Sequence, residues 1–457
     1  MPTPLILVTG STGYIASLLI PRLLERGYRV RALARQPERL KARSWYPQVE
    51  MVRGDVTDST SLLSALDGVQ TAYYLIHNMS FGRGYTSVEI EGARNFASAA
   101  EQAGVEHIIY LGGLADPEQH IAPHMRSRIE TGMTLRQGSV PVTEFRAGVI
   151  TGSGSISFEM IRFMAELFPI VPGPTWLKNR SQPIAVQNVI DYLLAALTNP
   201  NGRGGVYEIG VRKIYTYLEL MKIYAEMRGH KRSFVLLPFI PVWFMAFGID
   251  LMTPVPRRIA YALVGGLSSD SVILDDVADK AFPEVKLMEY ESAVSEAMKR
   301  LHPLKIERVW EDGLGGVKIL KHEGFFIDHR AIKVDAPPET IMDVVRRFDQ
   351  NGDWLFANWL WRLRGLFGVH TGSKRPDSIN FYEVDFSSPD HILFRSKLKA
   401  PGDGWMGWQV CDGMLVQTAY FAPRGLGGFL YWYLLAPFHA YLFRGLIRTI
   451  AEKAVVQ

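Results

Sequence analysis

The chain has 457 residues, and its 50 Lys and Arg against 46 Asp and Glu leave a formal charge of only +4 at neutral pH. Hydrophobic residues make up 47% and charged residues 21% of the composition, which is the balance of ordinary folded proteins and excludes an intrinsically disordered chain. The weak, dispersed positive charge gives no reason to expect a nucleic-acid partner, and the single cysteine, Cys411, excludes an internal disulfide and a cysteine metal site.

From Leu5 onward, short aliphatic runs alternate with amphipathic stretches of helical spacing. Strands are expected at residues 5–9, 29–34, 49–53, 71–76, 107–111 and 142–146. The helical stretches between them include residues 15–26 and 87–103, and Gly27 and Gly104 stand where such helices end. This alternation predicts an α/β Rossmann domain, in which helices cover a doubly wound parallel sheet.

The segment that follows, up to about residue 300, is mostly helical in pattern. Helices are expected at residues 155–167, 186–197 and 216–227. They are expected to form a substrate lobe beside the sheet. Residues 1–305 would then make one NAD(P)-binding domain, with its lobe at about 155–300.

A polar segment with several glycines, residues 302–316, precedes a change of pattern and marks the start of a second domain, residues 306–457. Strands are expected there at residues 325–334, 379–386, 391–399 and 414–421, and helices at 338–348 and 429–453. Strands followed by one long helix predict an α+β domain whose helix lies across a curved antiparallel sheet.

Two apolar stretches, residues 234–249 and 429–446, raise the question of membrane contact. The first contains two prolines and is shorter than the roughly 20 apolar residues of a spanning helix. The second contains His439 and Arg444. A buried or substrate-lining helix is the favoured interpretation of each stretch, a contact with the membrane surface is the second, and a spanning helix is the least favoured. The protein is therefore expected to be cytoplasmic, with membrane association as the alternative.

The most specific motif is the sequence Leu-Val-Thr-Gly-Ser-Thr-Gly-Tyr-Ile-Ala, which begins at Leu7. It places a Gly-x-x-Gly-x-x-Ala turn between the first expected strand and the first expected helix. Gly10 permits a tight turn, Gly13 lets the backbone approach a diphosphate, and Ala16 lets helix and strand pack closely. Since free amide groups at a helix start bind anions, the motif predicts a dinucleotide site.

The type of dinucleotide depends on the residues that follow the second expected strand. An acidic residue there would bind the ribose 2′-hydroxyl of NAD, whereas arginine suits the 2′-phosphate of NADP. The strand ends at Arg35 and Gln36 with no carboxylate, and the hydroxyls of Ser11 and Thr12 are expected nearby. NADP(H) is therefore favoured, while Glu38 keeps NAD(H) as the alternative.

These residues resemble the atypical, NmrA-like branch of the short-chain dehydrogenase/reductase superfamily over roughly residues 4–300. Gly54-Asp55-Val56 resembles the family's Asp-Val pair after the third strand, where the Asp side chain contacts the adenine. Leu75-Ile76-His77 follows the fourth strand, where family members contact the adenosine ribose. Arg146-Ala-Gly148 resembles the family's turn after the sixth strand. The expected cofactor-binding residues are therefore Gly10, Ser11, Thr12, Gly13, Tyr14, Ile15, Arg35, Asp55, Val56, Leu75, Ile76 and His77.

The C-terminal part is similar to a bacterial domain of unknown function related to helix-grip (START or polyketide-cyclase-like) folds. The resemblance rests on residues 352–354, 358–365, 401–405 and 431–439. Tryptophans are frequent there, including Trp354, Trp405 and Trp432. They either line a cavity for an apolar ring or acyl chain or simply fill a core of large side chains.

Reductases of the superfamily use a serine, a tyrosine and a lysine four residues after the tyrosine, on the same side of one helix. Here Gly112 stands at the serine position, and the expected window holds His124 and Arg128. In one interpretation His124 donates a proton near neutral pH and Arg128 anchors ribose or substrate. In the other, the helix has lost its catalytic side chains. The His, Asp and Glu residues show no metal-ligand spacing.

Three functions follow from these patterns. The first is an NADP(H)-dependent oxidoreductase that acts on a small apolar carbonyl, quinone or lipid-like substrate. The second is a non-catalytic sensor or partner-binding protein that binds NADP(H), and the third is a lipid-handling protein at the membrane face. The sequence indicates no oligomeric state.

Overall fold

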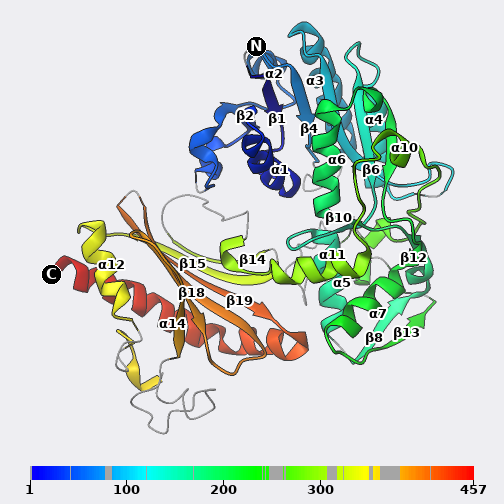
Figure 1. Cartoon of the computed structure of the whole chain (residues 1–457). Coiled ribbons are helices and arrows are strands. Elements are labelled where there is room, and N and C mark those ends of the chain that lie inside the picture. The colour runs from blue at the N-terminus through cyan, green and yellow to red at the C-terminus, as the bar shows by residue number, and fades with distance from the viewer. Residues whose placement is uncertain are drawn as a thin grey trace. The chain divides into compact units, whose positions relative to one another are not determined.

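The computed structural model describes residues 3–41, 43–77, 85–119, 121–167, 169–238, 240–241, 243–245, 247, 261, 264–305, 316–322, 324–348, 354–360, 381–411 and 413–456. Contacts divide the chain into two compact units (Figure 1). The first consists of residues 1–165 and 169–311, and the second of residues 166–168 and 312–457.

A seven-stranded parallel sheet organises the first unit. Its order is β11-β6-β5-β4-β1-β2-β3, with β1 Leu5–Val8, β2 Arg29–Ala34, β3 Glu50–Arg53, β4 Thr71–Tyr74, β5 His107–Gly113, β6 Val142–Ala147 and β11 Val206–Ile209. The Rossmann-like fold is thus confirmed, with all six predicted strands present. The sequence did not predict β11, because it is a four-residue edge strand with a charged residue, Glu208, inside it.

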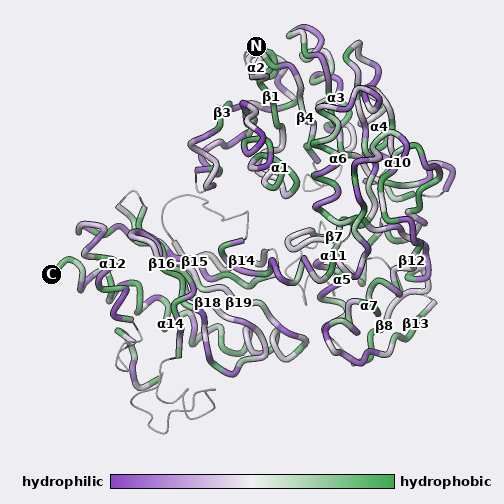
Figure 2. The backbone as a smooth tube through the Cα atoms, viewed as in Figure 1, coloured by the Kyte–Doolittle hydropathy of each residue, from purple (hydrophilic) through white to green (hydrophobic). Residues whose placement is uncertain are grey.

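Helices cover both faces of this sheet, as a doubly wound fold requires. The main covering helices are α1 Tyr14–Glu25, α2 Ser59–Leu66, α3 Tyr85–Gln102, α4 Pro123–Leu135 and α6 Val186–Thr198. One buried cluster joins α1 and α6 to the sheet, and another joins α2, α3 and the end of α4 to the opposite face. Along α6, polar residues in the first half interrupt a mostly hydrophobic helix (Figure 2), as expected of a helix with a broad buried side.

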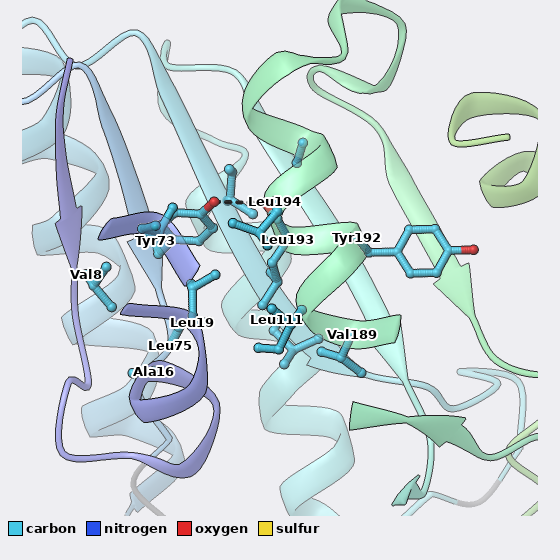
Figure 3. Packing of buried hydrophobic residues seen from close by; sticks show 14 of the residues in the cluster. Val8, Ala16, Leu19, Tyr73, Leu75, Leu111, Val189, Tyr192, Leu193 and Leu194 are labelled. Atoms are coloured by element: carbon cyan, nitrogen blue, oxygen red, sulfur yellow. Dashed lines mark hydrogen bonds between the residues drawn. The ribbon is translucent and has the colours of Figure 1, made fainter. Parts of the chain in front are cut away.

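The position of α6 corrects one prediction. The segment 186–197 was expected in the substrate lobe, but Val189 and Leu193 belong to the same core as Leu19 of α1 (Figure 3). The buried hydroxyl of Tyr73 in β4 donates a hydrogen bond of 2.7 Å to the carbonyl of Leu193. The helical pattern of residues 186–197 predicted α6 correctly, but it gave no information about whether this helix would cover the sheet or belong to the lobe.

A smaller group of elements packs beside the sheet around its own core. It contains α5 Ile156–Leu167, β8 Ile170–Pro174, α7 Tyr217–Met227, β13 Ser233–Leu237 and α11 Tyr290–Lys299. Shorter elements are β7 Ile150–Thr151 paired with β10 Ile184–Ala185, β9 Arg180–Ser181 paired with β12 Tyr215–Thr216, and α10 Val277–Ala281. Short 3₁₀ helices lie at Pro37–Leu40, Tyr46–Gln48, Thr175–Lys178, Pro200–Gly202 and Pro303–Lys305.

The apolar stretch 234–249 begins in β13, which pairs in parallel with β8, so a helix over its whole length is wrong. Alternate side chains of β13 are exposed, as in an edge strand with one covered side. Residues 243–245 are helical. Among the residues that the structure describes, no helix is both long enough and apolar enough to cross a membrane.

The second unit is an α+β structure with an antiparallel sheet in the order β14-β15-β19-β18-β17-β16. Its strands are β14 Gly316–His322, β15 Phe325–Lys333, β16 Tyr382–Ser387, β17 His391–Ser396, β18 Gly402–Cys411 and β19 Met414–Pro423, and its helices include α12 Pro338–Arg346 and α14 Gly425–Val456. The long helix α14 packs on one face of the sheet, as predicted (Figure 1). The sequence did not predict β14, which begins in the presumed linker, or β18, which contains three glycines.

Candidate functional site

The turn between β1 and α1 has the geometry that its glycines predict. Gly10 has a φ of +62°, and a Cβ at this position would lie 2.6 Å from the carbonyl oxygen of Leu75. The amide of Gly13 donates to the carbonyl of Gly10 at 2.7 Å, and a Cβ on Gly13 would lie 2.8 Å from that same oxygen. The loop therefore presents backbone rather than side chains at the start of α1, where an anion can bind.

Two hydroxyl groups hold this loop in place. Thr9 Oγ1 donates to the carbonyl of Tyr73 at 3.0 Å and accepts from the amide of Leu75 at 3.1 Å. Ser11 Oγ, fully buried, donates to the carbonyl of Leu33 at 2.8 Å. This differs from the expectation that Ser11 faces the 2′-phosphate, since its hydroxyl ties the loop to β2.

A pocket of about 270 Å³ lies beside the loop, at the carboxyl ends of the central strands. Nine of the twelve expected cofactor residues line it: Gly10, Thr12, Gly13, Arg35, Asp55, Val56, Leu75, Ile76 and His77. The structure adds Leu33, Ala34, Gly54, Thr57 and Val88 to this lining. Ser11, Tyr14 and Ile15 are not part of it. Dinucleotides bind at this edge of a doubly wound sheet, where the strand order reverses.

The loop after β3 is fixed by its own hydrogen bonds. The carboxylate of Asp55 accepts from the amide of Thr57 at 3.0 Å and from its hydroxyl at 2.9 Å. Gly54 passes so close to Leu33 that a Cβ would lie 2.7 Å from its Cδ1. The carbonyl of Val56 accepts from the side chain of Asn95 at 3.2 Å. Asp55 and Val56 thus have defined positions on the wall of the pocket.

Charged residues surround the end of β2. The side chain of Arg35 is exposed and lines the pocket. Glu38, the residue that kept NAD(H) as an alternative, forms an ion pair of 3.2 Å with Arg53 and is not part of the lining. Among the described lining residues, the carboxylate is that of Asp55, which accepts a hydrogen bond from Thr57. Asp55 lies after β3, where the adenine is expected to bind, and not after β2, where the 2′-group of the ribose is expected.

The expected catalytic pair lies on α4, with His124 in its first turn and Arg128 one turn later. His124 is only 4% exposed, and a Cβ on Gly266 would come within 2.9 Å of its imidazole. Burial, and then the charge of Arg128, lowers the pKa of His124 to about 3. At neutral pH its imidazole is therefore neutral, in contrast to the expectation of a group that titrates near pH 7.

Arg128 is positioned by the end of β5. The hydroxyl of Tyr110 donates to the carbonyl of Arg128 at 2.9 Å, and a Cβ on Gly113 would lie 3.0 Å from Arg128 Cδ. Burial, and then the charge of Arg128, also lowers the pKa of His77 well below its usual value. The charge of Arg128 thus acts on His77, which lines the pocket, and on His124, one helical turn before it.

One buried polar pair near this helix was missed by the sequence analysis. Ser127 of α4 donates its hydroxyl to the carboxylate of Glu89 in α3, and both side chains are buried. Burial raises the pKa of the Tyr110 hydroxyl above its usual range, and the negative charge of Glu89 contributes to this increase. No motif joins residues 38 positions apart, so only the packing of α3 against α4 could reveal this pair.

Comparisons with known proteins are consistent with this architecture. Residues 2–261 match the NmrA-like family, and residues 322–446 match a family described as a protein of unknown function, DUF2867. The chain is 33% identical over 115 residues to the 3-beta-hydroxysteroid dehydrogenase of Mycolicibacterium neoaurum, which covers 23% of this chain and 31% of that protein. The chain thus spans about a third of the length of the curated relatives that it matches first.

Two solved structures share the fold of the first unit. The triphenylmethane reductase of Citrobacter sp., complexed with NADP(H), has a TM-score of 0.52 and 21% identity, covering 64% of this chain and 99% of that one. The NADPH-dependent quinone oxidoreductase QOR2 of Escherichia coli, complexed with NADPH, has a TM-score of 0.53 and 19% identity, with the same coverage.

Proposed function

The chain belongs to the NmrA-like family, and from that membership we propose that it is an NADP(H)-binding oxidoreductase that reduces a small apolar substrate, either a carbonyl compound or a quinone. The observation that carries the proposal is the pocket of about 270 Å³ between the glycine loop and the loops after β2, β3 and β4. Its lining is the set of residues that a dinucleotide would contact. The related structures complexed with NADP(H) support the same assignment.

The preference for NADP(H) rests on the charges at the end of β2. Arg35 lines the pocket and offers a planar guanidinium to a 2′-phosphate. Glu38 would be the natural partner of a ribose 2′-hydroxyl, but it is paired with Arg53. Thr12 of the glycine loop also lines the pocket. A bound 2′-phosphate could accept charge-assisted hydrogen bonds from Arg35 and a further hydrogen bond from the Thr12 hydroxyl.

The proposed catalytic residue is Arg128. When bound, the cofactor supplies the hydride that adds to the carbonyl carbon of the substrate, and the carbonyl oxygen gains the negative charge. Arg128 stabilises that charge, because a guanidinium stays protonated and donates in a fixed geometry. His124 is neutral at neutral pH and has no imidazolium proton to donate. In this proposal the proton that completes the alcohol or quinol therefore comes from water.

The test is NADPH consumption, followed at 340 nm with a panel of quinones and aldehydes. We expect turnover in the wild-type protein and loss of most turnover in Arg128→Leu, with NADPH binding retained in calorimetry. Turnover that Arg128→Leu leaves unchanged would contradict the role of Arg128. The absence of calorimetric NADPH binding to the wild-type protein would refute the assignment as a whole.

A second function, a non-catalytic protein that binds NADP(H) and responds to its redox state, is favoured by one specific observation. The serine, tyrosine and lysine of working reductases are replaced by Gly112, His124 and Arg128, and the histidine is buried and neutral. NADPH binding without turnover on any substrate of the panel would support this function over the enzymatic one.

A further inference from the structure

The second unit contains a cavity of about 290 Å³ between α14 and the sheet. On its sheet side, three small residues on adjacent strands, Ser396 of β17, Gly404 of β18 and Ala419 of β19, leave space between larger lining side chains such as Met406 and Phe421. A Cβ on Gly404 would meet no atom closer than 3.6 Å. The space exists because the sheet carries small side chains where the rest of the same face carries large ones, such as Trp408 and Leu415.

On its helix side the cavity is lined by aromatic rings together with Leu435 and Leu442. Trp432 of α14 stacks on Phe421 of β19, with ring centroids 5.7 Å apart and an interplanar angle of 8°. Two turns further along the helix, His439 stacks on Phe443 at 5.2 Å and 13°. Tyr431 also lines the cavity. The planes of Trp432 and His439 are inclined at 51° to each other, so the lining presents ring faces and ring edges. Such a lining favours an aromatic or conjugated ligand, which gains contacts with the rings in addition to burial.

Polar groups are few in this lining. The hydroxyl of Ser396 accepts from the amide of Leu398 at 3.2 Å, so it is already engaged with the backbone. His439 lies against Trp432, with ring centroids 5.4 Å apart, and its imidazole is part of the lining although its Nδ1 is buried. A charged ligand would lose its hydration without gaining an ion pair, whereas an uncharged one needs only a single hydrogen bond.

We propose that this cavity binds an uncharged, planar molecule of two or three fused rings, with a carbonyl or hydroxyl oxygen directed at His439. The size of about 290 Å³ is at the lower end of the range for small-molecule sites, which is suited to such a ring system. The site lies wholly within the second unit, whose matched family is of unknown function. It does not depend on the dinucleotide site.

The test uses 6-propionyl-2-dimethylaminonaphthalene, an uncharged two-ring fluorophore with one carbonyl, titrated into the full-length protein without cofactor. We expect saturable one-to-one binding with a blue shift of its emission. Gly404→Leu and Ala419→Leu place a larger side chain in the cavity and should each weaken binding about tenfold or more. The matched control is Ala331→Leu, a similar change in β15 at a position that does not line the cavity; it should leave binding unchanged.

His439→Phe tests the hydrogen bond, since it keeps a ring at the wall and removes the nitrogens. We expect binding about threefold to tenfold weaker and a further blue shift, because the carbonyl loses its donor. If either cavity-filling variant fails to fold by circular dichroism, the other one decides. The proposal is overturned if the probe does not bind, if a folded cavity-filling variant binds as tightly as the wild type, or if saturating NADPH displaces the probe.

Discussion

Replacing Gly10 by alanine tests whether the loop after β1 needs its backbone geometry for cofactor binding. The substitution puts a methyl group on a residue with φ of +62°, 2.6 Å from the carbonyl oxygen and 3.0 Å from the carbonyl carbon of Leu75. Both contacts are to backbone, so no side-chain rotation can relieve them. The loop has to move by several tenths of an ångström, and the amides proposed to bind the diphosphate move with it.

The control separates this displacement from the cost of the dihedral angle alone. Gly27, directly after α1, has φ of +80°, and a Cβ there would meet nothing within 4 Å. Alanine in a left-handed conformation costs about 1–2 kcal/mol, which is the loss of unfolding free energy expected for Gly27→Ala. Gly10→Ala should lose about 1 kcal/mol more, because the clash adds to the dihedral cost.

The assays are urea unfolding for stability and calorimetry for NADPH. We expect Gly10→Ala to weaken NADPH binding about tenfold or more, while Gly27→Ala binds NADPH as the wild type does. Wild-type affinity in a folded Gly10→Ala protein would refute the inference that the close approach of Gly10 to Leu75 shapes the diphosphate site.

Three further predictions concern other parts of the first unit. Arg35→Ala should weaken NADPH binding about tenfold or more and leave NADH binding nearly unchanged, because only the 2′-phosphate loses a charge-assisted partner; an equal effect on both cofactors would contradict the role of Arg35. The low pKa of His124, about 3, means that the unfolded chain takes up a proton before the folded one does. Its contribution to stability is therefore complete above about pH 6.5 and is lost as the pH falls toward 3, so urea midpoints should fall less steeply with acid in His124→Phe than in the wild type. Leu193→Ala removes a fully buried side chain between α1, α6 and the sheet and should cost about 3–5 kcal/mol in urea unfolding, whereas a loss below 1 kcal/mol would show that this core can collapse around the change.

The parts of the fold that the sequence predicted are those with strong local patterns. Alternating aliphatic runs and helical stretches predicted the six strands from β1 to β6 and the long helix α14. Two of the strands that escaped prediction break such patterns, since β11 carries Glu208 and β18 carries Gly402, Gly404 and Gly407. β11 is stabilised by its pairing with β6, which lies far earlier in the chain, whereas β18 is stabilised by β17 and β19, the strands directly before and after it.

The candidate site shows the same division. The glycine motif, the end of the second strand and the resemblance to the NmrA-like family together predicted nine of the residues that line the pocket, because glycine turns and strand ends are local features. It did not predict that the hydroxyl of Ser11 would point to Leu33, or that His124 would be buried and neutral. Both depend on what packs around the side chain, as does the contact between Glu89 and Ser127. Burial sets the protonation state of His124, and its burial arises only when the first unit folds.

The small residues under α14 also set a limit on how stable the second unit can be. At Gly404 and Ala419 a larger apolar side chain would find space and would add buried contacts that the natural sequence leaves unused. Cavity-filling changes are a common way to stabilise a protein, so a larger apolar residue at either position should raise the free energy of unfolding. If the cavity binds the ligand proposed above, glycine and alanine at these positions provide room for it at the cost of part of the unit's resistance to heat and denaturant.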